Sequence, residues 1–300
     1  MLNPDALVLN KRTNYQMCGK LYVVATPIGN LADFSYRAVE ILKAVDLIAA
    51  EDTRHVKMLL QHYAISNKLL ALHQHNEEKA APGLIEKIKS GMNIALVSDA
   101  GTPLLSDPGM PLVKLARQEG IEVSPIPGAC ALIAALSVSG LPVTRFIFEG
   151  FLPRTSSARK AFFSERKSES ATWVFYESSH RILAALEDLA SVISGDRRIV
   201  VARELTKLFE TVVNDSLDNV LEKVKADSNM QKGEFVVLVE GALIEKNVSE
   251  ITEEQKRVLS VLLKESTIKT AVAMAVEITG ARKKVLYQAA LGMKEVLNGM

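Results

Sequence analysis

The chain has 300 residues, of which 48% are hydrophobic and 24% are charged, a balance typical of globular proteins. This length favours two domains with an appendage over a single core. Lysine and arginine number 36 against 35 acidic residues, and the resulting net charge of +1 excludes a nucleic-acid-binding protein that depends on bulk positive charge. Any nucleic-acid partner must therefore be held by local basic patches.

The N-terminal segment and the cysteines point to an ordinary reducing environment. Residues 1–18 contain no apolar segment of the kind found in a signal peptide, so we expect a loose tail. The two cysteines, Cys18 and Cys130, are isolated, which argues against a disulfide framework or a zinc site and favours the cytoplasm.

Residues 19–140 alternate short apolar runs with amphipathic stretches. Near-continuous apolar strands separated by helices predict an open, largely parallel sheet that is covered on both faces. The expected strands are 21–25, 46–51, 68–73, 93–98 and 122–126. We therefore predict an α/β domain over residues 19–140.

An uncharged segment at 124–144 resembles a membrane span in composition. Prolines and glycines confine its helical part to 129–139, which is roughly 16 Å long and short of the ~20 residues that a span needs. We predict a short helix buried on all sides and no membrane span.

The pattern changes after residue 140. Strand-like runs at 145–151, 172–177, 197–204, 208–213 and 233–241, with helical stretches between them, predict a second α/β domain over 141–245 with a mixed sheet. Strands 197–204 and 208–213 are close enough in sequence to pair antiparallel. Three successive helical patterns then predict a small helical domain over 246–300.

Polar and glycine-containing loops follow most of these strands. They begin with the segments TPIGNL at 26–31, EDTR at 51–54, SDAGTPLLSDPG at 98–109, PGACA at 127–131, YESSHR at 176–181 and RELTK at 203–207. Ligands bind outside the carboxyl ends of the strands of open parallel sheets, so these loops are the candidate binding site.

Each loop also has a purely structural interpretation. TPIGN and PGACA can be plain turns between a strand and a helix, and Asp107 is expected to cap a helix that starts near Pro108. Glu51 and Asp52, followed by Arg54, suit the start of a helix. Glu177 and Glu204 can be ordinary surface charges. Only the joint placement of these loops at strand ends favours a site.

Familiar cofactor motifs are missing from the sequence. It has no GxxxxGK[ST] phosphate loop and no GxGxxG after the first strand. The pair His73 and His75 has no evident third ligand, so we expect no metal site.

Taken in order, the segments LYVVATPIGNL, AAEDTR, LHQHNE, VSDAGTPLLSDPG, PGACA, FYESSHR, ARELTK and GEFVVLVEG resemble the tetrapyrrole methylase superfamily. They are closest to a branch that methylates the ribose 2′-oxygen of a cytidine in the decoding region of small-subunit (16S) ribosomal RNA. The resemblance covers roughly residues 19–297. It implies two α/β domains of the tetrapyrrole methylase type with a cofactor cleft between them, plus the C-terminal helical appendage.

The resemblance also implies S-adenosylmethionine as the cofactor. The residues that match its binding positions are Pro27, Asp99, Ala100, Gly101, Thr102, Leu104, Cys130, Ala131, Glu177, Gly233 and Glu234. Corrin-pathway members carry GDP where this chain has Gly101-Thr102-Pro103. This difference disfavours a corrinoid substrate and agrees with the RNA branch.

A ribose hydroxyl is a weak acid, so a general base is expected to help the transfer. The candidates from strand-end placement are Glu51, Asp52, Glu177 and Glu204, with Lys207 as an electrostatic helper. Each of two basic stretches, 151–170 and 264–284, has five basic residues against two acidic ones. Each stretch can equally be a solvated helix face. The candidate RNA-binding residues are Arg54, Arg154, Arg159, Lys160, Lys269, Arg282 and Lys283.

Three functions remain open on the sequence. The first is an RNA ribose methyltransferase that acts on the assembled small ribosomal subunit, with homodimerisation implied by the family. The second is a methyltransferase for a tetrapyrrole, and the third is a non-catalytic RNA-binding relative. The basic stretches favour the first over the second, and the intact cofactor loops favour it over the third.

Overall fold

The structure is a computed structural model that describes residues 18–243 and 251–298. Most of the predicted N-terminal tail (1–17) and the predicted domain boundary at 245–246 lie outside the described residues. The chain divides into two compact units, the first ending at Ala242 and the second beginning at Leu243, and each is described by itself.

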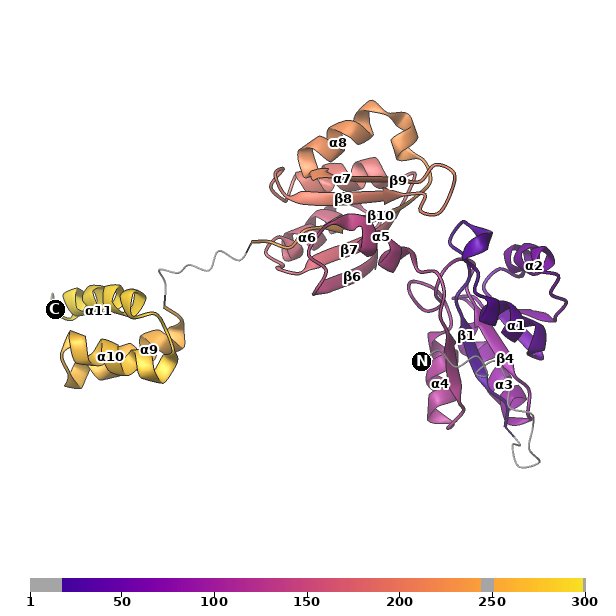
Figure 1. The fold of residues 1–300 in the computed structure, drawn as a ribbon, viewed down its shortest axis with the longest axis horizontal. Helices are drawn as coiled ribbons and strands as arrows, with labels where there is room; N and C mark the ends of the chain where they lie inside the picture. Colours follow the sequence, from indigo (N-terminus) through magenta and orange to yellow (C-terminus); the bar gives the residue numbers. More distant parts are fainter. Residues whose placement is uncertain (1–17, 244–250, 299–300) are drawn as a thin grey trace. The chain divides into compact units, whose positions relative to one another are not determined.

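The first unit begins with a five-stranded parallel sheet (Figure 1). Its spatial order is β3-β2-β4-β1-β5, which places β1 and β4 near the centre. The strands are β1 (Leu21–Val24), β2 (Leu47–Ala50), β3 (Leu69–Ala71), β4 (Ile94–Val97) and β5 (Val123–Ile126). The predicted open parallel sheet is confirmed.

Helices cover both faces of this sheet because successive strand side chains point to opposite sides. Tyr22 and Val24 pack against α1 (Tyr36–Ala44) and α2 (Thr53–His62). Leu21 packs with α3 (Glu77–Lys89) and α4 (Met110–Gln118) on the other face. A short 3-10 helix, η2 (Leu31–Asp33), precedes α1. The all-apolar strands of the sequence therefore reflect burial on two faces.

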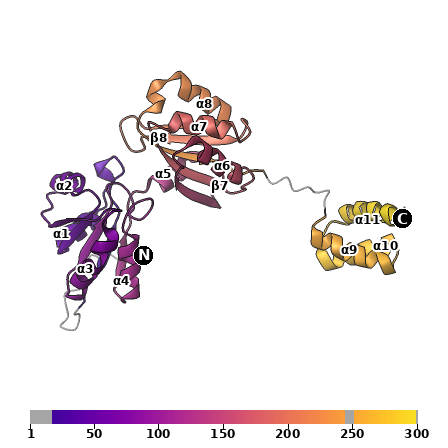
Figure 2. The ribbon, with the colours of Figure 1, turned by 180° about the vertical axis from the view of Figure 1, so that it is seen from behind.

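A second, mixed sheet follows with the order β6-β7-β10-β8-β9. β6 and β7 are parallel and the other pairs are antiparallel, including β8 with β9 as predicted. The strands are β6 (Phe146–Phe151), β7 (Thr172–Ser178), β8 (Arg198–Arg203), β9 (Thr211–Ser216) and β10 (Glu234–Val239). One face packs against α6 (Ser156–Arg166), α7 (Ile182–Ala190) and α8 (Leu217–Ala226), which Figure 2 shows from behind. The 3-10 helix η3 (Ser228–Gln231) leads into β10.

The uncharged helix α5 (Ala131–Ser139) covers the other face of this second sheet. Leu132 and Leu136 pack against β10, so the helix contributes to the core of the second sheet although we expected it in the first domain. The prediction that it is buried on all sides is wrong, because Ile133 is 53% and Val138 56% exposed. Within the described ranges, no helix is long and apolar enough to cross a membrane.

The second unit is made of α9 (Glu253–Glu265), α10 (Ile268–Thr279) and α11 (Lys283–Asn298). Thr252 and Gln255 form a capping box at the start of α9, and Gly280 ends α10 with φ of 66°. Leu259, Ala271 and Leu286 contribute to its separate apolar core. The predicted helical appendage is confirmed.

Candidate functional site

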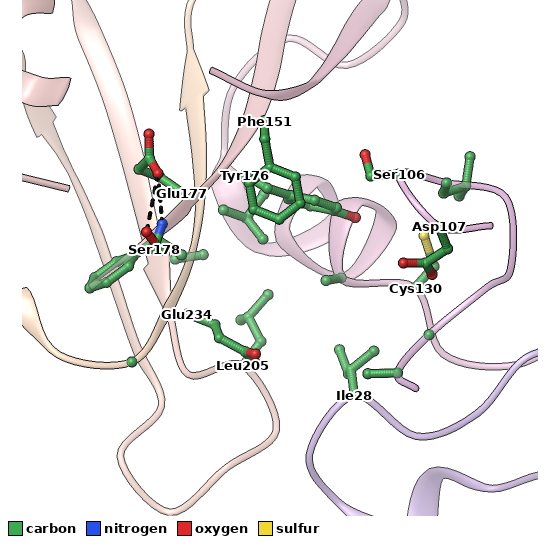
Figure 3. Close-up of a pocket in the computed structure, with 18 of the residues that line it drawn as sticks. Ile28, Ser106, Asp107, Cys130, Phe151, Tyr176, Glu177, Ser178, Leu205 and Glu234 are labelled. Carbon is green, nitrogen blue, oxygen red and sulfur yellow. Dashed lines mark hydrogen bonds between the residues drawn. The ribbon is translucent and has the colours of Figure 1, made fainter. Parts of the chain in front are cut away.

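A cavity of about 440 Å³ lies between the strand ends of the first sheet and one end of the strands of the second (Figure 3). Its volume is in the range of small-molecule sites. The lining residues come from seven loops and strand ends that are far apart in the sequence. They are Ile28, Asp99–Thr102, Leu105–Asp107, Cys130, Ala131, Phe151, Tyr176–Ser179, Ala202, Leu205, Lys207 and Gly233–Val236.

The loop after β4 forms one wall and is fixed by its backbone. Thr26 and Gly101 exchange two backbone hydrogen bonds, of 2.9 and 3.1 Å, and the buried Thr26 hydroxyl donates to Ser98 O. Gly101 has φ of +83°, and a Cβ there would lie 3.3 Å from Ile28 Cγ2. Any other residue would be strained at this position, so glycine is strongly favoured where this loop turns into the cavity.

Asp107 belongs to the cavity and does not cap a helix. The N-cap residue of α4 is Gly109, whose φ is +119°. Because glycine has no side chain, the cap residue itself cannot accept a hydrogen bond from the first turn of the helix. The Gly109 N–H donates instead to Glu77 Oε2 at 2.6 Å. Since Glu77 serves this N-terminal donor from α3, the Asp107 side chain is left to line the cavity, and the capping prediction is wrong.

Two of the expected cofactor positions do not line the cavity. Pro27 is buried, and its neighbour Ile28 reaches the cavity instead. Leu104 packs against the α3–α4 side of the core, while Leu105 lines the cavity. The structure thus places Pro27 and Leu104 next to lining residues rather than in the lining itself.

Tyr176 and Glu177 come from the end of β7. The Tyr176 hydroxyl accepts the N–H of Leu132 at 3.2 Å, and burial raises its pKa to about 12. Burial also raises the pKa of Glu177, which is 2% exposed. Its Oε1 accepts the Ser178 N–H at 2.8 Å. Arg181 Nη2 lies 3.1 Å from Oε2, but no donor in the described part of the chain is aligned to bond that oxygen.

Lys207, on the β8–β9 loop, forms ion pairs with two carboxylates. Its Nζ lies 2.8 Å from both Glu204 Oε1 and Glu234 Oε2. Burial opposes the ionisation of Glu204, but the bonds from Lys207 and from the Glu234 N–H outweigh it and lower the pKa. The Glu204 carboxylate is thus bonded to Lys207 and to the Glu234 backbone, and it does not line the cavity. Lys207 and Glu234 do line it.

Glu51 and Asp52 do not line the cavity either. Asp52 is the N-cap of α2, and its bonds to the side chain and backbone of Arg54 hold its pKa far below the usual range. This confirms the helix-start interpretation for Asp52. Burial, with the nearby charges of Asp107 and Asp99, raises the pKa of Glu51 to about 7.

The expected RNA-binding residues differ in their exposure to solvent. Arg154 and Lys160 are exposed near the start of α6, and the Arg54 side chain is 90% exposed but paired with Asp52. Arg159 is buried, with its guanidinium 2.7 Å from Asp188 and bonded to Arg154 O, so it cannot face a phosphate and is removed from this set. In the second unit, Lys269, Arg282 and Lys283 are exposed.

Sequence reasoning missed several lining residues. Phe151 and Tyr176 pack edge to face at a centroid distance of 5.7 Å, and Asp107 and Ser106 lie on the loop after β4. The aromatic residues stand at strand ends, which was an available signal. Asp107 was hidden by its proximity to a helix start. Among the described residues, no cluster of three potential metal ligands occurs.

Comparison with known proteins adds the family. Residues 20–221 match the family described as Tetrapyrrole (Corrin/Porphyrin) Methylases, and residues 249–294 match the RsmI C-terminal HTH domain. Among solved structures, a diphthine synthase is similar with a TM-score of 0.56 and 19% identity, covering 74% of this chain and 90% of that one. A cobalt precorrin-4 methyltransferase has a TM-score of 0.52 and 17% identity, covering 74% and 94%. At these identities, the two structures support the fold alone.

Curated relatives have a much higher sequence identity to this chain than these two solved structures do. A ribosomal RNA small subunit methyltransferase I from Escherichia coli O157:H7 is 50% identical over 273 residues, which cover 91% of this chain and 95% of the relative. The protein of the same name from Xylella fastidiosa (strain Temecula1) is 52% identical over 269 residues, covering 90% and 98%. This chain therefore belongs to the ribosomal RNA small subunit methyltransferase I family, within the tetrapyrrole methylases.

Proposed function

We propose that this protein uses S-adenosylmethionine to methylate the ribose 2′-oxygen of a cytidine in the decoding region of small-subunit ribosomal RNA. The observation that carries the proposal is the cavity at the strand ends, in a chain that shares its family with small-subunit methyltransferases. The tetrapyrrole alternative is disfavoured because the C-terminal unit matches the domain of the RNA branch.

The cavity residues fit S-adenosylmethionine in charge and shape. Four carboxylates line it against the single lysine Lys207, and the cofactor carries a sulfonium and an ammonium group. The carboxylates are those of Asp99, Asp107, Glu177 and Glu234. One buried oxygen, Glu177 Oε2, has no aligned donor among the described residues and suits a cofactor N–H or O–H group.

We assign the cofactor as the family resemblance implies. Asp99, Ala100, Gly101 and Thr102 hold its amino-acid end, Cys130 and Ala131 contact it from the start of α5, and Glu177, Gly233 and Glu234 lie near the adenosine. When bound, the cofactor supplies an electrophilic methyl group. Of the five residues expected to act in catalysis, Glu177 and Lys207 stay in the proposed machinery, since they line the cavity.

Exposed basic residues of both units are the proposed RNA contacts. Arg154 and Lys160 lie near the start of α6, and Lys269, Arg282 and Lys283 lie on α10, on the connection to α11 and at the start of α11. We also propose a homodimer, as the family implies, with the exposed Ile133 and Val138 of α5 as candidate contacts. A ribosomal substrate places the protein in the cytoplasm.

The test is to incubate the protein with methyl-labelled S-adenosylmethionine and small ribosomal subunits that lack the modification. The RNA is then digested to nucleosides and analysed by mass spectrometry. Labelled 2′-O-methylcytidine supports the proposal. Label in a base contradicts the assigned bond, and absence of label with cofactor binding intact favours a tetrapyrrole substrate.

A further inference from the structure

The cavity has a second side that the cofactor assignment does not use. Its residues are Leu105, Ser106, Asp107 and Phe151, which none of the expected cofactor positions includes. Figure 3 shows Asp107 beside Cys130, with Ser106 and Phe151 above them and the Tyr176 hydroxyl pointing toward the same side.

The backbone is specially shaped to bring these residues together. Strand β6 has a register shift between Phe148 and Phe151, and Gly150 within it has φ of +67°. A Cβ on Gly150 would lie 3.2 Å from Ser106 Oγ, so the end of β6 passes close to the loop that carries Asp107. Bulges of this kind redirect a side chain at a strand end, and here the redirected side chain is Phe151.

Phe151 offers an aromatic surface at the rim. Phe151 is 58% exposed, although it lines the cavity and its ring packs against Tyr176. The Tyr176 hydroxyl in turn accepts the Leu132 N–H. An exposed ring on a firm support is the usual platform on which an unpaired base stacks. The exposed Arg154 follows three residues later in the sequence and offers a cation for a phosphate of the same strand.

Asp107 offers a proton acceptor in the same place. Its side chain is half-buried and lines the cavity on the loop that is assigned to the amino-acid end of the cofactor. Asp99, Glu51, Tyr176 and Cys130 are the titratable groups near it. Burial, with the charge of Asp99, raises its pKa to about 6 and outweighs a hydrogen bond with the Ser98 side chain, which lowers it. Asp107 is therefore ionised at neutral pH and still basic enough to accept a proton.

The other carboxylates are less suited to this role. Glu51 lies outside the cavity lining, and Glu204 is bound to Lys207. Glu177 stands on the opposite side of the cavity, beside Ser178 in Figure 3.

We propose that the side of the cavity formed by Asp107 and Phe151 receives a single unstacked nucleotide, with its base on the Phe151 ring and its ribose hydroxyl at Asp107. The inference rests on the proposed ribose methylation. The hydroxyl oxygen forms a bond to the methyl carbon as the carbon–sulfur bond breaks, and the electron pair of that bond stays on sulfur. The hydroxyl proton passes to the Asp107 carboxylate.

The proposal predicts that two variants fail in different ways. Asp107→Asn is expected to lower kcat about 100-fold or more, because the amide cannot accept the proton, with the dissociation constants of cofactor and subunit within threefold of wild type. Wild type is expected to show a rise of kcat with pH near pH 6, and Asp107→Asn is expected to remove it. Phe151→Ala is expected to weaken binding of the unmethylated subunit about tenfold, with the cofactor dissociation constant unchanged.

Cofactor affinity is measured by calorimetry, subunit affinity by filter binding, and turnover by mass spectrometry of nucleosides. Asp196→Asn and Tyr36→Ala are the matched controls, since both residues are exposed outside the cavity lining. The inference is overturned if wild type forms 2′-O-methylcytidine and Asp107→Asn turns over within threefold of it. Loss of cofactor binding in either variant also overturns it, because that side then serves the cofactor. Wild type that places label only in a base overturns the proposed function itself.

Discussion

Asp99 Oδ1 accepts the backbone N–H of Asp52 at 2.9 Å, which ties the cofactor loop after β4 to the start of α2. The tie is reciprocal, since the Glu51 carboxylate accepts a bond from the Asp99 backbone. Two strand-end loops that are 47 residues apart thus fix each other. Glu51 and Asp52, which we expected to act in catalysis, instead support the wall of the cavity.

Removing the Asp99 side chain should loosen that wall. Asp99→Ala leaves the Asp52 N–H without its partner, at a cost of about 1–3 kcal/mol in the bound conformation of the loop. We expect the cofactor dissociation constant to rise about tenfold by calorimetry. Asp196→Ala, at an exposed position outside the cavity lining, is the control and should leave this constant unchanged. Equal affinities in the two variants would contradict both the structural role of the tie and the assignment of Asp99 to the cofactor.

Glu51 should make stability depend on pH in a defined direction. Its pKa is raised to about 7 in the folded protein, so the folded state binds the proton more tightly than the unfolded state does. The free energy of unfolding contributed by this proton is present below about pH 4.5 and is lost as the pH rises to 7.

Glu51→Gln removes this loss, because the amide is neutral at every pH and its oxygen still accepts the Asp99 bond. After solvent screening, we expect the variant to gain about 1 kcal/mol in the free energy of unfolding at pH 8. This gain corresponds to a Tm a few degrees above that of wild type. At pH 5 the two proteins should differ much less. A larger Tm difference at pH 5 than at pH 8 would show that the sign of the pKa shift is wrong.

Arg159 should matter for folding rather than for RNA. The Arg159 and Asp188 side chains are only 6% and 9% exposed. Arg159→Ala therefore removes the buried guanidinium from a buried carboxylate, which keeps only the Ser156 hydroxyl and the more distant Lys160 on its other oxygen. We expect a loss of about 3 kcal/mol in the free energy of unfolding, measured by urea denaturation. Lys167→Ala, at an exposed position just after α6, should change it by no more than about 0.5 kcal/mol. The folded fraction of Arg159→Ala should bind subunits with the wild-type salt dependence.

If the basic residues around the α10–α11 connection bind RNA, they should contribute to the salt dependence of the affinity for the ribosomal subunit. Lys283→Ala removes one exposed cation, and each lost phosphate contact lowers the slope of log affinity against log salt by about 0.7–0.9. Arg257→Ala is the control in the same unit, because Arg257 is paired with Glu254 at 2.7 Å. Slopes that are the same for both variants and wild type would contradict the assignment of Lys283 to RNA.

The order of strands and helices could be predicted because the signals are local. Apolar runs such as Leu47–Ala50 and the helical patterns after residue 252 depend only on neighbours in the chain. The placement of glycine and polar loops after strands also located the cavity, since parallel strands bring their carboxyl ends to one edge.

Only the tertiary structure decided which side chains face the cavity. Asp107 lost its predicted capping role because Glu77, 32 residues away, bonds the Gly109 N–H. Arg159 is buried rather than exposed because it pairs in the interior with Asp188, 29 residues away. Ile133 and Val138 are exposed because α5 packs one side against the second sheet. Composition and spacing determine the elements and their sequence, whereas the partner of a polar group is set by contacts between distant segments, which no local pattern contains.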